Sequence, residues 1–326
     1  MLIFTENEIR QCVETNLQSI AVVEAAFSSL VTRKVEMPPI MRVDIPENNG
    51  EVDVKTAYIE GYEMFALKVS SGFFNNYKLG LPSGNGMMLL ISTATGTPQA
   101  LLLDNGYLTH IRTAAAGAIS VNYLARETIQ TVGVIGTGSQ ARFQLEALKQ
   151  IRDFSNVIVY GRNPANVTKF IHEMEASLAV SVSADSDAEV VVRESDVVIT
   201  TTPTKTPIIK PEWVHPGLHI TAMGSDAEHK QELAAAVLGK ADLIVCDVKS
   251  QCFRLGELHH ALNEGIITND SPIVELGEIT SGKKIGRSNN QQITICDLTG
   301  TGVQDTAIAL YAYEKLLKSG LGMKIK

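Results

Sequence analysis

The sequence lacks the features of several protein classes. Its 326 residues include 28 lysines and arginines against 36 aspartates and glutamates, a net charge of −8. Without a basic excess, non-specific binding to nucleic acid or to an anionic membrane surface is disfavoured. No apolar run approaches transmembrane length, and the start MLIFTENEIRQCVE has no basic segment before an apolar run. We therefore expect a cytoplasmic protein without a signal peptide or a membrane partner.

Cysteine is scarce and follows no pattern. The four cysteines form no CxxC pair, which favours reduced thiols. Cys12, Cys246 and Cys296 lie in apolar contexts, where small core residues are more common than nucleophiles or metal ligands. The histidines lack metal-ligand spacing with nearby acids, so we expect no metal site.

The hydrophobic content, 44%, is sufficient for two domains. Short apolar strands alternate with helical patterns from about residue 130, which predicts an α/β domain with a doubly wound parallel sheet of the Rossmann type. The expected strands are Thr131–Ile135, Val157–Tyr160, Ala179–Ser183, Asp196–Thr201, Leu218–Ala222 and Asp242–Val245, with one more candidate at Gln292–Leu298.

The chain before residue 112 has a different character. An amphipathic helix over Ser19–Leu30 precedes strand-like runs broken by Gly, Pro and Asn, and the turn TATGTP predicts an antiparallel hairpin. The last helix, Thr306–Ser319, needs a surface that buries its apolar face, so we expect it to pack on the N-terminal part. The predicted domains are an α+β domain, 1–112 plus 303–326, and a dinucleotide-binding domain, 113–302.

A glycine turn follows the first strand of the parallel region and opens a helix. In Gly136-x-Gly138-x-x-Ala141, the first glycine permits a tight turn, the second admits a pyrophosphate, and the small third residue lets helix and strand pack closely. Its place inside a doubly wound pattern favours dinucleotide binding over a merely tight turn. The predicted cofactor residues here also include Thr137, Ser139 and Gln140.

The end of the second strand carries information on the cofactor. Enzymes that bind NAD usually have an acid there for the ribose hydroxyls, whereas this chain has Tyr160-Gly161-Arg162-Asn163. Because no carboxylate would repel a 2′-phosphate and Arg162 can contact one, the sequence favours NADP over NAD, with Arg162 and Asn163 as cofactor residues. The alternative is that Arg162 is a solvated loop residue.

Three basic residues stand in apolar or small-residue contexts in the N-terminal part: Arg42 in PPIMRVDI, Lys68 in MFALKVSSGF and Arg112 in LTHIRTAAAGA. Such residues suit a carboxylate, which an arginine can bind through two hydrogen bonds. The alternatives are surface strand charges for Arg42 and Lys68 and a helix-face charge for Arg112. The apolar flanks argue against full exposure of all three.

Ser225 and Asp226 follow the fifth strand, at the sheet edge where ligands of this fold bind. Ser225-x-x-Glu228 also has the form of a capping box, and on these residues alone a helix cap is the preferred interpretation.

Longer motifs extend over most of the chain. They are MPPIMR, ALKV, GLPSGNGMMLLISTATGTPQALLLDNGYLTHIRTAAAGA, VGVIGTGSQA, GSDAEHKQEL and DLTGTGVQDTAIA. On these motifs the chain resembles the ornithine cyclodeaminase and mu-crystallin family. The resemblance implies a Rossmann domain, a substrate-binding domain that also forms a homodimer interface, and a nicotinamide cofactor.

The resemblance also implies roles for individual residues. Arg42, Lys68 and Arg112 become ligands of a substrate carboxylate, and Lys68 and Asp226 become catalytic residues, which moves the preference for Asp226 from cap to catalysis. Thr113 resembles the position that meets the cofactor phosphates, and the loop from Leu298 to Val303 resembles one that closes near the nicotinamide. Thr202 and Gly302 complete the implied cofactor set.

One position departs from the family pattern. Lys55 stands where ornithine cyclodeaminases carry a glutamate involved in proton handling, which disfavours the multistep cyclodeaminase route. We therefore expect NAD(P)H-dependent reduction of a small imino acid, with Δ1-pyrroline-2-carboxylate giving L-proline as the first choice. The alternatives are ornithine cyclodeaminase, a reductase of an acyclic imino acid, an enzyme of ectoine breakdown, and a non-enzymatic protein that binds NADP or a small ligand, as mu-crystallin does.

Overall fold

The structure, a computed structural model, describes residues 1–325 and divides into two compact units. The first unit is Met1–Arg112 together with the chain from Thr301 onward, and the second is Thr113–Gly300. One boundary therefore falls inside helix α3 (Tyr107–Leu124), and the other comes just before helix α10 (Gly302–Ser319). A nucleotide-binding turn in mid-chain is explained by this arrangement, because the first unit surrounds the second in sequence.

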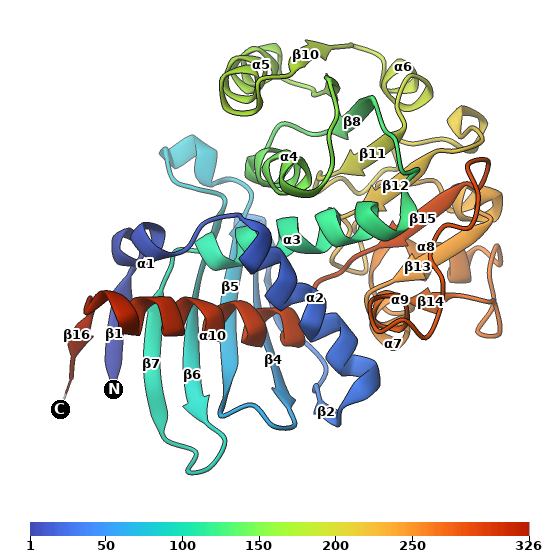
Figure 1. Ribbon diagram of the computed structural model, residues 1–326. Coiled ribbons are helices and arrows are strands. Elements are labelled where there is room, and N and C mark those ends of the chain that lie inside the picture. Colours follow the sequence, from blue (N-terminus) through green and yellow to red (C-terminus); the bar gives the residue numbers. More distant parts are fainter. Residues whose placement is uncertain (326) are drawn as a thin grey trace. The chain divides into compact units, whose positions relative to one another are not determined.

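An eight-stranded, mostly antiparallel sheet forms the first unit. Its strands run in the order β16-β1-β7-β6-β5-β4-β2, and β3 also pairs with β4 (Figure 1). The elements are β1 (Leu2–Thr5), α1 (Glu6–Cys12), α2 (Leu17–Thr32), β2 (Val35–Glu36), β3 (Met41–Ile45), η1 (Pro46–Asn48), β4 (Gly50–Ile59), β5 (Met64–Phe73), η2 (Asn76–Leu79), β6 (Gly84–Ser92), β7 (Pro98–Leu103) and β16 (Met323–Lys324).

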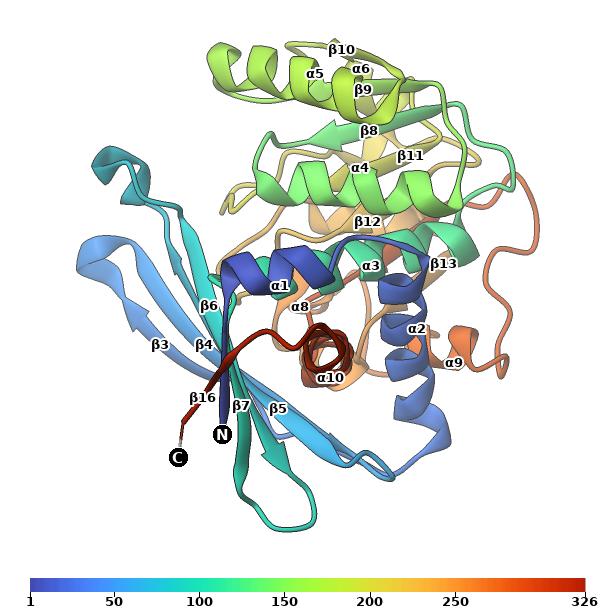
Figure 2. The same ribbon diagram turned by 60° about the vertical axis from the view of Figure 1, so that its left-hand side comes forward.

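Helix α10 packs on this sheet. Its Thr306 hydroxyl donates to the Ala57 carbonyl of β4 and accepts from the Ala66 amide of β5, at 2.8 and 3.1 Å. Beside these bonds, Val303 and Ala307 share a buried cluster with residues of α2 and β4. Helices α1, α2 and α10 lie on the same side of the sheet (Figure 2). The predicted packing of the last helix is confirmed, as is the hairpin between β6 and β7.

The second unit contains an eight-stranded sheet in the order β10-β9-β8-β11-β12-β15-β13-β14, with every neighbouring pair parallel. Its elements are β8 (Thr131–Ile135), α4 (Ser139–Ile151), β9 (Asn156–Tyr160), α5 (Pro164–Leu178), β10 (Ser181–Ala184), α6 (Ala188–Arg193), β11 (Val197–Thr200), η3 (Pro211–Trp213), β12 (His219–Ala222), η4 (Ala235–Lys240), β13 (Leu243–Cys246), α7 (Lys249–Cys252), α8 (Gly256–Asn263), β14 (Val274–Glu275), α9 (Leu276–Thr280) and β15 (Thr294–Asp297).

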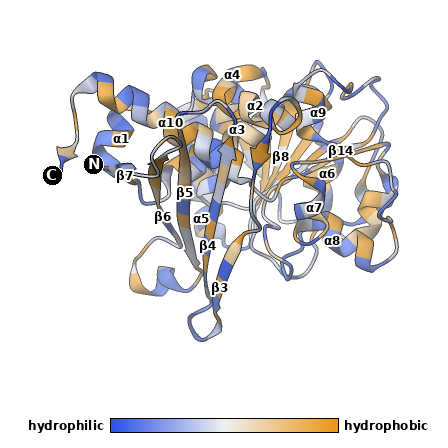
Figure 3. Ribbon diagram, turned by 90° about the horizontal axis from the view of Figure 1, so that it is seen from below, coloured by the Kyte–Doolittle hydropathy of each residue, from blue (hydrophilic) through white to orange (hydrophobic). Residues whose placement is uncertain are grey.

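Both faces of the parallel sheet are covered by apolar residues. Val197 and Ile199 of β11 join one buried cluster, whereas Val198 between them joins another. This double burial explains why the strands are continuously hydrophobic (Figure 3). The doubly wound fold predicted from the sequence is confirmed, and all seven expected strands are present within about two residues of their predicted ends.

Two local expectations need correction. No helix begins at Ser225, since residues 223–234 form turns and irregular backbone, so the capping-box interpretation is wrong. Cys246, Cys252 and Cys296 are buried free thiols, but Cys12 is only partly buried. Among residues 1–325, no helix combines the length and the apolar character needed to cross a membrane.

Candidate functional site

Three buried charges meet in the first unit. Lys68 on β5 and Arg112 on α3 each contact the carboxylate of Asp305 in the first turn of α10, at 3.0 Å from Nζ and from Nε respectively. The side chains of Lys68, Arg112 and Asp305 are 1%, 7% and 0% exposed. Two cations share one carboxylate here, so the cluster holds one positive charge that a second carboxylate can balance.

The buried position changes the acidity of Lys68. Burial, followed by the charge of Arg112, lowers the pKa of Lys68 to about 7, while Asp305 acts in the opposite direction. A bound carboxylate would favour the ammonium form further. Lys68 can therefore bind an anion or exchange a proton near neutral pH.

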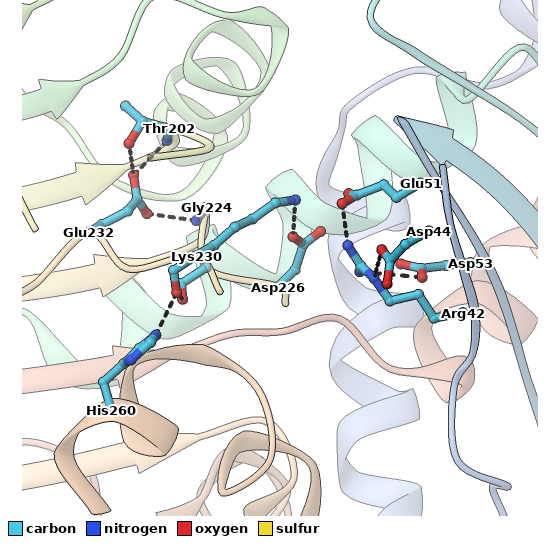
Figure 4. A network of polar contacts seen from close by, with 11 residues as sticks. Arg42, Asp44, Glu51, Asp53, Thr202, Gly224, Asp226, Lys230, Glu232 and His260 are labelled. Atoms are coloured by element: carbon cyan, nitrogen blue, oxygen red, sulfur yellow. Dashed lines mark hydrogen bonds and ion pairs between the residues drawn. The ribbon is translucent and has the colours of Figure 1, made fainter. Parts of the chain in front are cut away.

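Arg42 is arranged differently from the other two cations. It lies on β3 opposite Asp53 of β4, and its guanidinium contacts Asp44 at 3.0 Å, Asp53 at 3.4 Å and Glu51. Figure 4 shows Arg42 among these three carboxylates. In its predicted role as a substrate ligand, Arg42 would use a guanidinium that already contacts three protein carboxylates.

Lys55 lies directly opposite Lys68 in the pairing of β4 with β5. Both side chains are buried, and the charge of Lys55 contributes to the lowered pKa of Lys68. The register and the alternation of strands place Arg42, Asp53, Lys55 and Lys68 on one face of the sheet. The departure from the family pattern therefore lies beside a predicted carboxylate ligand.

The glycine turn of the second unit has the geometry that a pyrophosphate needs. Gly136 has φ +116°, and a Cβ there would meet the Thr201 hydroxyl at 2.8 Å, so only glycine fits. A Cβ at Gly138, the residue before α4, would point into open space, which leaves the backbone accessible to a ligand at the helix N-terminus. Ala141 is fully buried between helix and sheet. The turn fits a dinucleotide.

The remaining residues near this turn have defined positions. Thr137 is partly buried and Ser139 is exposed, at the start of α4. The side chain of Gln140 accepts a hydrogen bond from Gln144, which also donates to the backbone carbonyl of Thr113 at 3.0 Å. These contacts connect α4 with the second half of α3. The predicted cofactor residues of this group lie at or beside the turn.

The end of β9 matches the sequence expectation of a loop without a carboxylate. Arg162 is exposed there, and Asn163 caps α5 by accepting from the amides of Ala165 and Asn166 at 2.9 and 3.3 Å. Capping explains Asn163 without a cofactor. The role of Arg162 stays a prediction.

The loop from Leu298 to Val303 is firmly held at two places. In the second unit, the Asp247 carboxylate accepts from the amides of Thr299 and Gly300, at 2.9 and 2.7 Å. In the first unit, a Cβ on Gly302 would lie 2.2 Å from the Thr56 carbonyl oxygen of β4. Close packing on β4 therefore accounts for this glycine, and its predicted cofactor contact stays a prediction.

Asp226 lies on the irregular segment after β12, not on a helix. Its carboxylate forms an ion pair with Lys230 Nζ at 2.7 Å. The Ser225 hydroxyl, which was expected to cap a helix, donates to the Lys230 carbonyl instead. Figure 4 shows Lys230 reaching back to Asp226.

Glu232 ties this segment to the end of β11. Its carboxylate accepts from the amide and hydroxyl of Thr202, from the Thr200 hydroxyl and from the Gly224 amide, at 2.5 to 2.7 Å. Burial raises the pKa of Glu232, and these hydrogen bonds oppose the increase. Thr202, a predicted cofactor residue, is thereby fixed at the carboxyl edge of the sheet, where this fold binds its ligands.

Three residues of these arrangements were not anticipated from the sequence: Asp305, Lys230 and Glu232. An acid in the first turn of a helix, as at Asp305, is an ordinary dipole-favoured residue, so its burial leaves no sequence signal. Lys230 and Glu232 follow Asp226 by four and six residues, but without a helix their spacing has no fixed geometry.

Comparison with known proteins identifies the family of the chain. A model described as "Ornithine cyclodeaminase/mu-crystallin family" matches residues 2–320. An uncharacterized cyclodeaminase of Sinorhizobium fredii is 47% identical over 323 residues, which cover 99% of this chain and 98% of the relative.

Two solved structures extend this likeness. The Δ1-pyrroline-2-carboxylate reductase of Thermococcus litoralis, in complex with NADH and L-proline, has a TM-score of 0.95 and 32% identity, with 100% of both chains covered. An archaeal alanine dehydrogenase dimer with bound NAD has a TM-score of 0.92 and 36% identity, covering 100% of this chain and 99% of that one.

Proposed function

We propose, from the premise that this chain belongs to the ornithine cyclodeaminase/mu-crystallin family, that it reduces a small cyclic imino acid with a nicotinamide cofactor, and that Δ1-pyrroline-2-carboxylate is its substrate. The observation that carries the proposal is the buried cluster of Lys68 and Arg112 around a single carboxylate. It offers one positive charge for one substrate carboxylate, in a chain that also carries a dinucleotide turn.

The residues have distinct roles in this proposal. Lys68 and Arg112 bind the substrate carboxylate and orient the imine carbon, and Arg42 supports them from the same sheet face. Asp226 stabilises the positive charge of the iminium nitrogen. When bound, the cofactor supplies a hydride; the turn at Gly136 and Gly138 holds its pyrophosphate.

Lys55 weighs against the cyclodeaminase alternative. A substrate with a second ammonium group, such as ornithine, would bring another cation to a sheet face where Lys55 and Lys68 already oppose each other. An imino acid has no second amine, so it brings one cation fewer than ornithine to this face. The position of Lys55 therefore favours reduction of an imino acid over release of ammonia from ornithine.

A substrate panel tests the proposal. Oxidation of NADH and NADPH should be fastest with Δ1-pyrroline-2-carboxylate, slower with the six-membered ring analogue and with acyclic imines of pyruvate and oxaloacetate. Ornithine should release no ammonia in the presence of the oxidised cofactors. If ornithine releases ammonia and no imino acid drives oxidation of the cofactor, the protein is a cyclodeaminase and not a reductase.

The lowered pKa of Lys68 predicts a pH dependence. Its ammonium form, which binds the carboxylate, is present below about pH 7 in the free enzyme and is lost as the pH rises through that value. We therefore expect kcat/KM for the imino acid to fall about tenfold per pH unit above this point. Lys68→Arg keeps its charge at every pH, so this limb should be absent from its profile.

The proposed preference for NADP rests on Arg162 and on the missing acid at the end of β9. Arg162→Ala should weaken NADPH binding by about tenfold and NADH binding by less than twofold, because only NADPH carries the 2′-phosphate. The matched control is Lys169→Ala, which removes an exposed cation from α5. Equal affinity losses for NADPH and NADH in Arg162→Ala would contradict the preference.

We also propose that the chain forms a homodimer through the open face of the first sheet. Met41, Val54, Val69 and Met87 form one apolar row across four paired strands, on the face opposite Lys68. Met41 and Met87 are 59% and 40% exposed. An exposed apolar row of this kind is unusual on a protein that is monomeric in water. The mass in solution, with Met87→Lys as the disrupting variant, checks the assignment.

A further inference from the structure

We propose that Lys230 holds Asp226 as a carboxylate, so that Asp226 acts as the counter-ion of the cationic substrate nitrogen and not as its proton donor. This inference rests on the proposed imine reduction. The imine then takes up its proton from the buffered solvent before it binds, and this proton remains on the amine of the product, while Asp226 begins and ends the reaction ionised.

The first argument is the unequal burial of the two partners. Lys230 is 4% exposed at its side chain, whereas Asp226 is 38% exposed, and 2.7 Å separates Nζ from the carboxylate. A buried ammonium requires an anion, because an unpaired charge in such a place is costly. The partial exposure of the Asp226 carboxylate leaves it accessible to a ligand. An ammonium at this distance also favours the ionised over the protonated acid.

The second argument is the rigidity of the segment. The Lys230 carbonyl accepts from the Ser225 hydroxyl and from His260 Nε2 of α8, the latter at 2.8 Å. The Gly224 amide donates to Glu232 at 2.7 Å. Hydrogen bonds therefore hold the backbone on both sides of Asp226. Lys230 is held through its backbone carbonyl as well as through its ammonium group. Such preorganisation suits a permanent charge that a transition state meets without rearrangement.

Several other titratable groups lie near the pair of Asp226 and Lys230. Glu228 and His229 are exposed on the same segment, His260 faces the Lys230 carbonyl, and Glu257 accepts from the amides of Glu232 and Leu233. Burial raises the pKa of Glu257 well above its usual value, which favours its neutral form. Lys230 forms an ion pair with Asp226 at 2.7 Å.

Kinetics give the first test. The wild-type kcat should be independent of pH down to the acidic limb on which Asp226 becomes protonated. In Lys230→Met this limb should move upward by roughly one to three pH units, since a close opposite charge lowers a carboxyl pKa by that amount. Lys230→Arg should restore the limb, and His260→Gln should leave it in place. An unmoved limb in Lys230→Met overturns the inference.

A spectroscopic measurement separates this inference from the proposed reaction. The infrared difference between the wild type and Asp226→Asn, recorded at pH 7 without substrate, should contain a carboxylate band and no protonated carboxyl band. In the Lys230→Met background a protonated carboxyl band should appear at a higher pH than in the wild type when the pH is lowered. A protonated carboxyl in the wild type would make Asp226 a proton donor and overturn the inference, whether or not any imine is reduced.

Discussion

Asp226→Asn should lower kcat for imine reduction on the order of 10²-fold and leave cofactor affinity intact, with a lower thermal midpoint because the buried Lys230 loses its anion. The substitution removes the negative charge but keeps the volume, so the lost quantity is the stabilisation of the positive charge that the substrate nitrogen carries. Because Asp226 caps no helix, no loss of capping accompanies the change. Single-turnover rates and the thermal midpoint, measured on the same protein, check both halves of the expectation.

Glu228→Gln is the matched control for this experiment. Glu228 is exposed on the same segment, two residues from Asp226, and the change removes the same charge. Its kcat should stay within a factor of two of the wild type. Similar losses of kcat in the two variants would show that the general charge of the segment matters, and would remove the specific role assigned to Asp226.

The fold was predictable where local patterns act alone. The parallel strands bury both faces, so each is a short apolar run with turn residues at its ends, and β8 has its predicted limits. The helix predicted after Ser225 is absent because local patterns do not act alone there. There Ser225 and Glu228 have the spacing of a capping box, but Glu232 holds the backbone at Gly224 and the chain never enters a helix. The same carboxylate binds Thr200 and Thr202 at the end of β11, and the spacing of Ser225 and Glu228 gives no sign of these contacts.

The site was predictable in its residue types but not in its pairing. Apolar flanks correctly indicated that Lys68 and Arg112 avoid full exposure. Their common partner, Asp305, lies about 190 residues or more away in sequence, and no periodicity links positions at that separation. Strand register has the same property: the opposition of Lys55 and Lys68 follows from the pairing of β4 with β5, which one sequence does not specify.

Asp305→Asn should destabilise the protein by about 3–5 kcal/mol at pH 6, because it leaves two buried cations without their shared anion. The loss should be smaller above pH 7, where Lys68 is already neutral in the folded state and only Arg112 still needs the carboxylate. The direction of this pH dependence follows from linkage. The pKa of Lys68 is lower in the folded protein than in the unfolded chain, so the folded protein contains the buried ammonium, which needs Asp305, only at lower pH. Urea unfolding at pH 6 and pH 8.5 measures both values.

A double-mutant cycle separates this electrostatic role from an interaction of Asp305 with the α10 dipole. Lys68→Met removes one of the two cations. Asp305→Asn should therefore lower the free energy of unfolding less in the Lys68→Met background than in the wild type. The difference should be about 1 kcal/mol or more, the coupling energy of two residues in contact. Equal costs in both backgrounds would mean that Asp305 stabilises the helix start and has no coupling to Lys68. With the coupling present, Asp305 holds together the two cations proposed to meet the substrate carboxylate, and its loss should raise KM as well as the fraction unfolded.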